Sequence, residues 1–552
     1  MTRRKDFPAL LAVALAVAMT WPLILHLGTE TQFVDSWGDP LYLTWQVAWI
    51  GHALLHSPLH LLESNFYFPV RNNLALTDVV FGYAPAGLLA GSGPQAALIV
   101  HNLLFIFTYA LAFLGAYLLA REVGAGEWGG AAAGAAFAYA PWKLGQNGHL
   151  HVLSSGGIPL ALALLLRGHR RGSRRSIVAG WLVAAWQMTL GFNLGLQFAY
   201  LLLVLGLLVV GHWVIDRARR PSRAVIGASA AGVGVFLTVT VLVAAPYLQV
   251  RQDLPQPKAP AAAVAFYSPP PRAFITAPSF SYVWGGATAD RRATLRVGAT
   301  IEQTLFPGVT VLLLALLGLA SSAYSFGLRL GLMAGTLVCF ALSLGFRSVD
   351  HPDQGFTPFR FLYDFAPGWD NVRTPGRINN LTSLGLALLA GAGLALVVRT
   401  LRRQFPRGAV ASVAASALVT AILVEGFGPI PHPRVPAVPP GQLSQPAPQL
   451  NLPTNDFTDG EYAYWGIGPF PKMANAASSF DPQVILDVRS ASQTFPDLRS
   501  VEFLRRIDVR SVILHRDLAF GTPWQDTADR PIAGLGITRR DEGELVVYDL
   551  GP

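Results

Sequence analysis

The chain has 552 residues, of which 52% are hydrophobic and only 13% are charged, and its mean hydropathy is +0.41. This composition is too apolar for a soluble cytosolic enzyme and is typical of a polytopic membrane protein. The formal charge of +9 does not indicate nucleic-acid binding, because the basic residues lie in short loops between apolar runs. The single cysteine, Cys339, lies inside an apolar run, which excludes an intramolecular disulfide and a cysteine metal cluster.

The first apolar run, from about Phe7 to Leu27, directly follows Arg3, Arg4 and Lys5. It is longer than a signal-peptide core and lacks a small-residue cleavage pattern, so it predicts an uncleaved first span with a cytoplasmic N-terminus. Three later loops are also rich in arginine, and the positive-inside rule assigns them to the cytoplasm. Their arginines are Arg167, Arg170, Arg171, Arg174 and Arg175; Arg217, Arg219, Arg220 and Arg223; and Arg399, Arg402, Arg403 and Arg407.

Further apolar runs match a bilayer core of about 30 Å and predict a bundle of about 11 transmembrane helices with the C-terminus outside. After the first span they lie near 97–120, 127–141, 150–167, 176–192, 194–213, 224–246, 305–324, 327–346, 381–398 and 408–426. The stretch 79–92 is expected to be an interfacial helix, because a crossing there would move the arginine-rich loop 167–175 outside. The outer loops are then 28–96, 247–304 and 347–380.

The end of the chain differs in character from the apolar part. We expect residues 1–426 to form the transmembrane domain, 427–453 a proline-rich extended linker, and 454–552 a small extracytoplasmic α/β domain. From residue 427 onward the chain has 11 basic and 15 acidic residues, so this part is acidic. The expected elements are strands at Val484–Val488, Ser511–His515 and Leu545–Asp549, a helix at Val501–Arg506, and a hairpin turn at Asp541–Gly543.

Two carboxylates, Asp35 and Asp39, lie near the start of the first outer loop, beside Trp37 and Tyr42. A carboxylate that is partly desolvated at the membrane surface has a raised pKa and is suited to remove a proton from a hydroxyl. The alternative is structural: either aspartate can cap an interfacial helix that starts near Leu41.

Arginines on the outer side are informative, because the positive-inside bias should deplete them. Arg373 and Arg377, just before a predicted span, are placed to bind a phosphate at headgroup depth through bidentate donors. The alternatives are anionic lipid headgroups or ion pairs with Asp364 and Asp370. The outer arginines are Arg272, Arg291, Arg292, Arg296, Arg360, Arg373 and Arg377.

Other polar residues on the predicted outer side are His149, His151 and Glu302. The i, i+2 spacing of the histidines argues against a shared metal, so a phosphate contact or a structural hydrogen bond is expected for them. Glu302 is suited to orient an arginine or an acceptor, or it is a solvated helix end. The sequence contains no phosphate-binding loop with its lysine, no His-Glu-x-x-His motif and no Gly-x-Ser-x-Gly elbow.

This arrangement of an uncleaved first span, a long acidic outer loop and a bundle of further spans resembles the GT-C superfamily of membrane glycosyltransferases. Over roughly residues 1–400 several stretches are similar to a group of bacterial members. They are Gly38-Asp39-Pro40 with Trp45, Phe68-Pro69, His149-Leu150-His151, Glu302 with Leu305-Phe306-Pro307-Gly308, and Arg373-Thr374-Pro375-Gly376-Arg377.

The resemblance implies a polyprenyl-phosphate sugar as donor, transfer at the outer face of a bacterial inner membrane, and an inverting mechanism. Asp39 or Asp35 matches the acidic residue that acts as base in GT-C enzymes, and Asp78 is a second candidate acid. The loop lacks the adjacent acidic pair found in several branches, so the choice between the two stays open. A glycan, lipid or protein acceptor fits equally, and a divalent metal is neither required nor excluded.

Two rival functions also fit a polytopic membrane protein with outer arginines. A lipid or polysaccharide transporter should carry ionisable residues within its spans, and Glu425 is an exception to their scarcity here. A non-catalytic assembly factor with a GT-C scaffold is the second rival, because a fold does not fix a function.

Overall fold

The computed structural model describes residues 6–33, 36–216, 220–252, 254–255, 258–352, 354–405, 408–478 and 480–551. Contacts between residues divide the chain into two compact units. The first, here called the helical unit, comprises Met1–Ile24, Leu104–Val243 and Lys258–Pro431. The second, the sheet unit, comprises Leu25–Leu103, Ala244–Pro257 and His432–Pro552.

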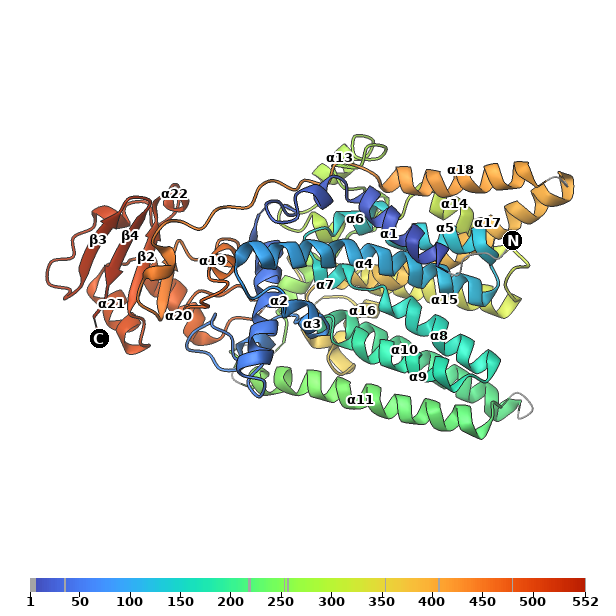
Figure 1. Cartoon of the computed structure of the whole chain (residues 1–552), viewed down its shortest axis with the longest axis horizontal. Coiled ribbons are helices and arrows are strands. Elements are labelled where there is room, and N and C mark those ends of the chain that lie inside the picture. Colours follow the sequence, from blue (N-terminus) through green and yellow to red (C-terminus); the bar gives the residue numbers. More distant parts are fainter. Residues whose placement is uncertain are drawn as a thin grey trace. The chain divides into compact units, whose positions relative to one another are not determined.

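Each predicted span contains a helix, and the prediction of an all-α polytopic bundle is confirmed (Figure 1). Seven helices in the described part of the chain are long and apolar enough to cross a membrane. They are α4 (Pro94–Val123), α7 and α8 together (Leu150–Leu153, Gly157–Arg171), α10 (Phe192–Ile215), α11 (Arg223–Arg251), α15 (Phe326–Ser343), α17 (Asn379–Gln404) and α18 (Ala409–Gly426).

The other four predicted spans contain shorter helices, so the count of 11 is not confirmed. These helices are α1 (Phe7–Met19), α5 (Gly126–Tyr139), α9 (Arg174–Met188) and α14 (Val309–Leu319). Short helices also occupy the connections of the helical unit: α6 (Pro141–Gly145), α12 (Ala261–Tyr267), α13 (Ala289–Ala293) and α16 (Pro358–Phe365). The stretch 79–92 forms only a 3-10 turn, Phe81–Tyr83, and α3 (Ala84–Gly87), which are too short to cross a bilayer.

Helix α17 is the centre of the helical unit and packs against α5, α14, α15 and α18. Glycines allow a close crossing of α5 and α17, because a Cβ at Gly129 would lie 2.5 Å from the carbonyl oxygen of Gly391. By contrast, α10 leaves an apolar face exposed, including Leu203, Leu207 and Leu208. An exposed face of this composition on a long apolar helix is suited to contact with lipid.

The sheet unit contains a four-stranded sheet in the order β1-β2-β4-β3. Strand β1 (Gln449–Leu452) is parallel to β2 (Ser511–His515), and β4 (Leu545–Asp549) is antiparallel to both β2 and β3 (Thr538–Glu542). One face of the sheet packs on α20 (Gln483–Ser492) and α21 (Leu498–Arg506), and α22 (Arg516–Ala519) follows β2. Strand β1 lies within 427–453, the range expected to be a linker, so the sheet begins before residue 454.

Most of the predicted elements of this unit are confirmed, but Val484–Val488 is a correction. This segment is part of helix α20 and not a strand. Its buried residues are Ile485, Val488 and Ser492, a spacing of three and four that fits one face of a helix. Strands β2 and β4 and helix α21 form as predicted, and the turn follows Glu542.

The first outer loop and the C-terminal sheet fold together within the sheet unit. The amides of Tyr67 and Phe68 donate to the carbonyls of Asn475 and Met473 at 3.0 and 2.8 Å, and Met473 N donates back to Asn65 O at 2.7 Å. Helix α19 (Asp459–Trp465) also packs against α2 (Gly38–His56). The segment that carries Asp39 is therefore supported by residues more than 400 positions later in the chain.

Candidate functional site

A buried cluster of charged and polar side chains surrounds Arg377 in the helical unit. Arg377 Nε and Nη2 donate to Glu302 Oε1 at 3.0 and 2.6 Å, and Nη1 lies 2.9 Å from His151 Nε2. His149 Nδ1 lies 3.8 Å from the same Glu302 oxygen and 2.8 Å from Gln146 Oε1. We call His149, His151, Glu302 and Arg377 the polar cluster. Four residues that the sequence singled out are thus brought together.

The protonation of His151 follows from its partner. A guanidinium has only donors, so His151 Nε2 must accept from Arg377 and the ring proton is placed on Nδ1. The cluster is also well shielded from water, because the side chains of Arg377 and Glu302 are only 15% and 6% exposed. Their ion pair therefore lies in a low-dielectric site, where charges interact strongly.

Tight turns position these side chains. Arg377 lies in the 3-10 turn Pro375–Ile378 directly before α17, and Glu302 lies in the 3-10 turn Ile301–Gln303, which packs against it. A Cβ at Gly376 would lie 2.8 Å from the carbonyl oxygen of Glu302, so glycine permits the close approach of the two turns. In the Thr-Pro-Gly-Arg motif the glycine therefore serves the packing of the two turns, and the arginine supplies the charged group of the polar cluster.

Lys143, which the sequence analysis did not select, lies in α6 and is fully buried. Its Nζ donates to Ser155 Oγ and Asn380 Oδ1, both at 2.7 Å, and to Val152 O at 3.3 Å. Burial lowers the pKa of Lys143 to about 7, whereas three acceptors around one nitrogen favour the ammonium form. The sequence does carry a signal for this residue: it is a lone lysine in a predicted outer segment, where basic residues should be depleted.

Arg373 makes a different contact from Arg377: its guanidinium lies over the ring of Tyr267, 5.1 Å from the ring centroid. Several of the other outer arginines have structural partners. Arg272 donates to Thr294 O, Arg292 to Ala277 O and Gly285 O, and Arg360 to Asp364 Oδ2. Asp370 lies 3.8 Å from Lys258 Nζ. The two aspartates suggested as alternative partners of Arg373 and Arg377 therefore pair with other residues.

The candidate acids lie in the sheet unit. Asp39 is an exposed residue in the first turn of α2, which begins at Gly38 and not near Leu41. The N-cap of α2 is Trp37, with no side-chain capping bond, so Asp39 is not the capping residue. Asp78 is half-buried in the same unit. Asp35 lies outside the described residues.

A buried hydroxyl pair lies one turn along α2 from Asp39. Tyr42 Oη lies 3.0 Å from Tyr67 Oη and 3.3 Å from Thr77 Oγ1. Burial raises the pKa of Tyr42, the hydrogen bonds oppose this, and the charge of Asp39 raises it further. Tyr42 therefore stays protonated at neutral pH and fixes the base of α2 by hydrogen bonds.

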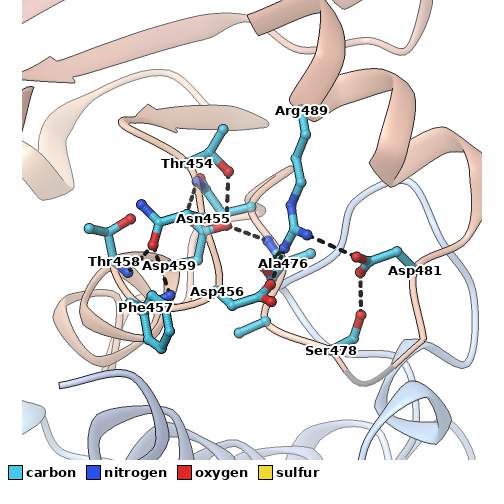
Figure 2. A network of polar contacts seen from close by, with 12 residues as sticks. Thr454, Asn455, Asp456, Phe457, Thr458, Asp459, Ala476, Ser478, Asp481 and Arg489 are labelled. Carbon is cyan, nitrogen blue, oxygen red and sulfur yellow. Dashed lines mark hydrogen bonds and ion pairs between the residues drawn. The ribbon is translucent and has the colours of Figure 1, made fainter. Parts of the chain in front are cut away.

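An arginine-centred network holds the loop that precedes α19 (Figure 2). Arg489 donates to Asp456 Oδ1 at 2.5 Å, to Asp481 Oδ2 at 2.8 Å and to Ala476 O at 2.7 Å. Asp459 accepts from the amide of Ala476 at 3.0 Å. Burial raises the pKa of Asp459 to about 7, and that amide and the Arg489 charge oppose the rise. The network fixes the loop that lies against the N-terminus of α2.

Within the described ranges no group of three or more His, Cys, Asp or Glu side chains could hold a metal ion. The polar cluster and Lys143 supply arginine, lysine and histidine side chains, whose N–H groups bind oxyanions.

No protein-family model matches the chain, and no curated protein sequence matches it either. Among solved structures, the arabinofuranosyltransferase AftD from Mycobacteria aligns with a TM-score of 0.56 at 15% identity, over 99% of this chain and 41% of AftD. The chain has a GT-C-like fold.

Two further structures with this GT-C-like fold are less similar. The oligosaccharyltransferase AglB from Archaeoglobus fulgidus, in complex with an inhibitory peptide and a dolichol-phosphate, has a TM-score of 0.47 at 14% identity over 99% of this chain and 73% of AglB. ArnT from Cupriavidus metallidurans, bound to undecaprenyl phosphate, has a TM-score of 0.41 at 13% identity over the full length of both chains.

Proposed function

We propose that this protein is a membrane glycosyltransferase that moves a sugar from a polyprenyl-phosphate-linked donor to an acceptor hydroxyl at the extracytoplasmic face, with inversion. The observation that carries the proposal is the polar cluster, in which the largely buried Arg377 contacts Glu302 and His151, and His149 lies near the same Glu302 oxygen. The GT-C-like fold supports the reaction class, since AftD is an arabinofuranosyltransferase.

The proposed reaction needs a base and an oxyanion stabiliser. Asp39 or Asp35 takes the proton of the acceptor hydroxyl while its oxygen forms a bond to the anomeric carbon. The bond between that carbon and the phosphate oxygen breaks, and the polyprenyl phosphate leaves with the electron pair. Arg377, with Arg373 and His149, stabilises this developing negative charge.

The ion pair with Glu302 is compatible with phosphate binding. One oxygen of Glu302 accepts hydrogen bonds from both Nε and Nη2 of Arg377, which fixes the plane of the guanidinium. The arginine is therefore oriented before a ligand arrives. Preorganised donors of this kind act on developing charge without having to reorganise during the reaction.

Glu425 gives no support to the rival function of an ion-coupled transporter. Its Oε1 accepts from the amide and the hydroxyl of Thr310 at 2.9 and 2.6 Å, at the start of α14. Gly308 is the N-cap of that helix and has no side chain to cap it, so Glu425 supplies the cap from α18. The carboxylate has a structural explanation.

The test is sugar transfer by the purified protein in nanodiscs from a panel of radiolabelled polyprenyl-phosphate sugars. Asp39→Asn or Asp35→Asn should abolish transfer, and Arg377→Met should lower it strongly. Asp364→Asn is the matched control for removal of a carboxylate, because Asp364 pairs with Arg360 at the surface. Full activity in both Asp39→Asn and Asp35→Asn would refute their role as base, and unchanged turnover in Arg373→Ala and Arg377→Ala would refute the phosphate role.

A further inference from the structure

We propose that Lys143 is a positioning residue of the donor-phosphate site. It joins the segments that carry His151 and Arg377. It also supplies a positive charge to the site, because the charge of Arg377 is balanced by Glu302. The inference rests on the proposed function and specifies how the donor phosphate is attracted. It also predicts that a residue without direct contact to the phosphate determines the affinity for the donor.

Lys143 makes hydrogen bonds to both sides of the polar cluster. On one side its Nζ binds Val152 O and Ser155 Oγ, at 3.3 and 2.7 Å, directly after His151 in the chain. On the other side it binds Asn380 Oδ1 at 2.7 Å. All three ammonium protons are thereby used, so Lys143 has no donor left for a ligand.

Asn380 transmits this contact to the arginine. Its Oδ1 accepts from Lys143, and its Nδ2 donates to the carbonyl oxygen of Arg377 at 3.2 Å. His151 in turn accepts from Arg377 Nη1. Hydrogen bonds therefore connect Lys143 to Asn380, Asn380 to Arg377, and Arg377 to His151. The short helix α7 completes the ring, because it contains both His151 and Val152, whose carbonyl oxygen accepts from Lys143.

The charges in this region do not balance. Arg377 and Glu302 form one ion pair. No carboxylate in the described part of the chain lies within ion-pair distance of Lys143, whose three acceptors are an amide, a hydroxyl and a peptide carbonyl. Counting Lys143, Arg377 and Glu302, the region carries one excess positive charge inside an apolar bundle. A buried cation without a counter-ion is costly, and an incoming anion relieves that cost.

Aromatic rings beside the ammonium group of Lys143 offset part of the cost of burying it. Lys143 Nζ lies 5.2 Å from the ring centroid of Trp142 and 5.5 Å from that of Phe137. Ring faces stabilise a desolvated cation but do not neutralise it. The region therefore retains its excess charge for a ligand phosphate.

Four variants separate the charge of Lys143 from its hydrogen bonds. Lys143→Met removes the charge at similar length, and Lys143→Arg keeps it. Asn380→Asp places a carboxylate at the position of the present amide oxygen, so it neutralises Lys143 in place. Asn380→Leu is its matched control, because both substitutions lose the bond to the carbonyl of Arg377 but only aspartate adds charge.

Two readouts are measured in nanodiscs: binding of undecaprenyl phosphate, which needs no turnover, and KM and kcat for transfer. We expect Lys143→Met and Asn380→Asp to weaken lipid binding and raise donor KM about tenfold or more, with a much smaller change in kcat. Lys143→Arg should recover much of the affinity, and Asn380→Leu should bind more tightly than Asn380→Asp. Thermal unfolding of each variant shows that the fold is retained.

The failures of the two proposals are distinguishable. If the wild-type protein binds undecaprenyl phosphate and transfers sugar but Lys143→Met and Asn380→Asp leave affinity and KM unchanged, the role of Lys143 is refuted and the glycosyltransferase proposal stands. Equal affinities in Asn380→Asp and Asn380→Leu would likewise refute the charge argument. If the wild-type protein neither binds the lipid phosphate nor transfers sugar from any donor in the panel, both proposals fall.

Discussion

The ion pair between Arg377 and Glu302 should be the strongest single polar interaction of the helical unit. Both side chains are largely buried and are joined by two hydrogen bonds of 3.0 and 2.6 Å. Removing one partner of such a pair leaves an uncompensated buried charge and costs about 3–5 kcal/mol. We therefore expect Glu302→Gln and Arg377→Met each to lower the free energy of unfolding by about 3 kcal/mol, and the double variant to lose clearly less than the sum.

The assay is a double-mutant cycle measured by reversible unfolding in mixed detergent micelles, followed by tryptophan fluorescence. The matched control is Arg360 with Asp364, a pair at 2.8 Å whose side chains are 24% and 34% exposed. That pair is four residues apart on one helix, and its coupling should be only about 0.3–0.5 kcal/mol. If the Arg377–Glu302 coupling is no larger than that of the control, burial does not strengthen this pair and the description of the polar cluster is wrong.

Three further predictions concern backbone fit and pH. Gly308→Ala should destabilise the protein by about 2 kcal/mol or more, because φ at Gly308 is +98° and a Cβ there would meet the carboxylate that caps α14. Gly206 has open space around it, so Gly206→Ala is the control and should not destabilise the protein. Thermal unfolding compares the two variants. Gly460→Ala should separate α19 from α2, since a Cβ would lie 2.5 Å from Gly38 O, and faster proteolysis of this segment would report it. Burial raises the pKa of Glu461 from 4.5 to about 7, so the folded state binds more protons than the unfolded state and stability falls as pH rises between these values. Glu461→Gln should therefore be neutral at pH 4 and stabilising by about 3 kcal/mol at pH 8; equal effects at both pH values would contradict this.

Local sequence patterns predicted the helices well, because an apolar run in a chain of this composition has few alternatives to a helix in lipid. The patterns failed at Val484–Val488, where five mostly apolar residues fit a strand or a helix equally. The packing of Val488 in one core with the strands decides for the helix, and no local pattern contains that information. Pairing between β1 and β2 joins positions more than 60 residues apart, which explains why β1 was not predicted.

Residue type and depth in the predicted topology were sufficient to select His149, His151, Glu302 and Arg377 as candidates. They were not sufficient to separate Arg377, which lies in the cluster, from Arg373, which lies over Tyr267. The two arginines are four positions apart beside one proline turn, so the sequence does not distinguish them. Their side chains point in different directions, and packing determines those directions.

By itself the sequence determined a helical membrane bundle with an acidic outer loop and a small terminal sheet, since hydropathy and charge act over neighbouring residues. The tertiary structure decided which polar side chains meet: His151 and Arg377 are 226 positions apart, and Lys143 and Asn380 are 237 apart. In an apolar bundle a buried charge must find its partners among the helices that pack around it, so these contacts depend on the packing of the whole unit.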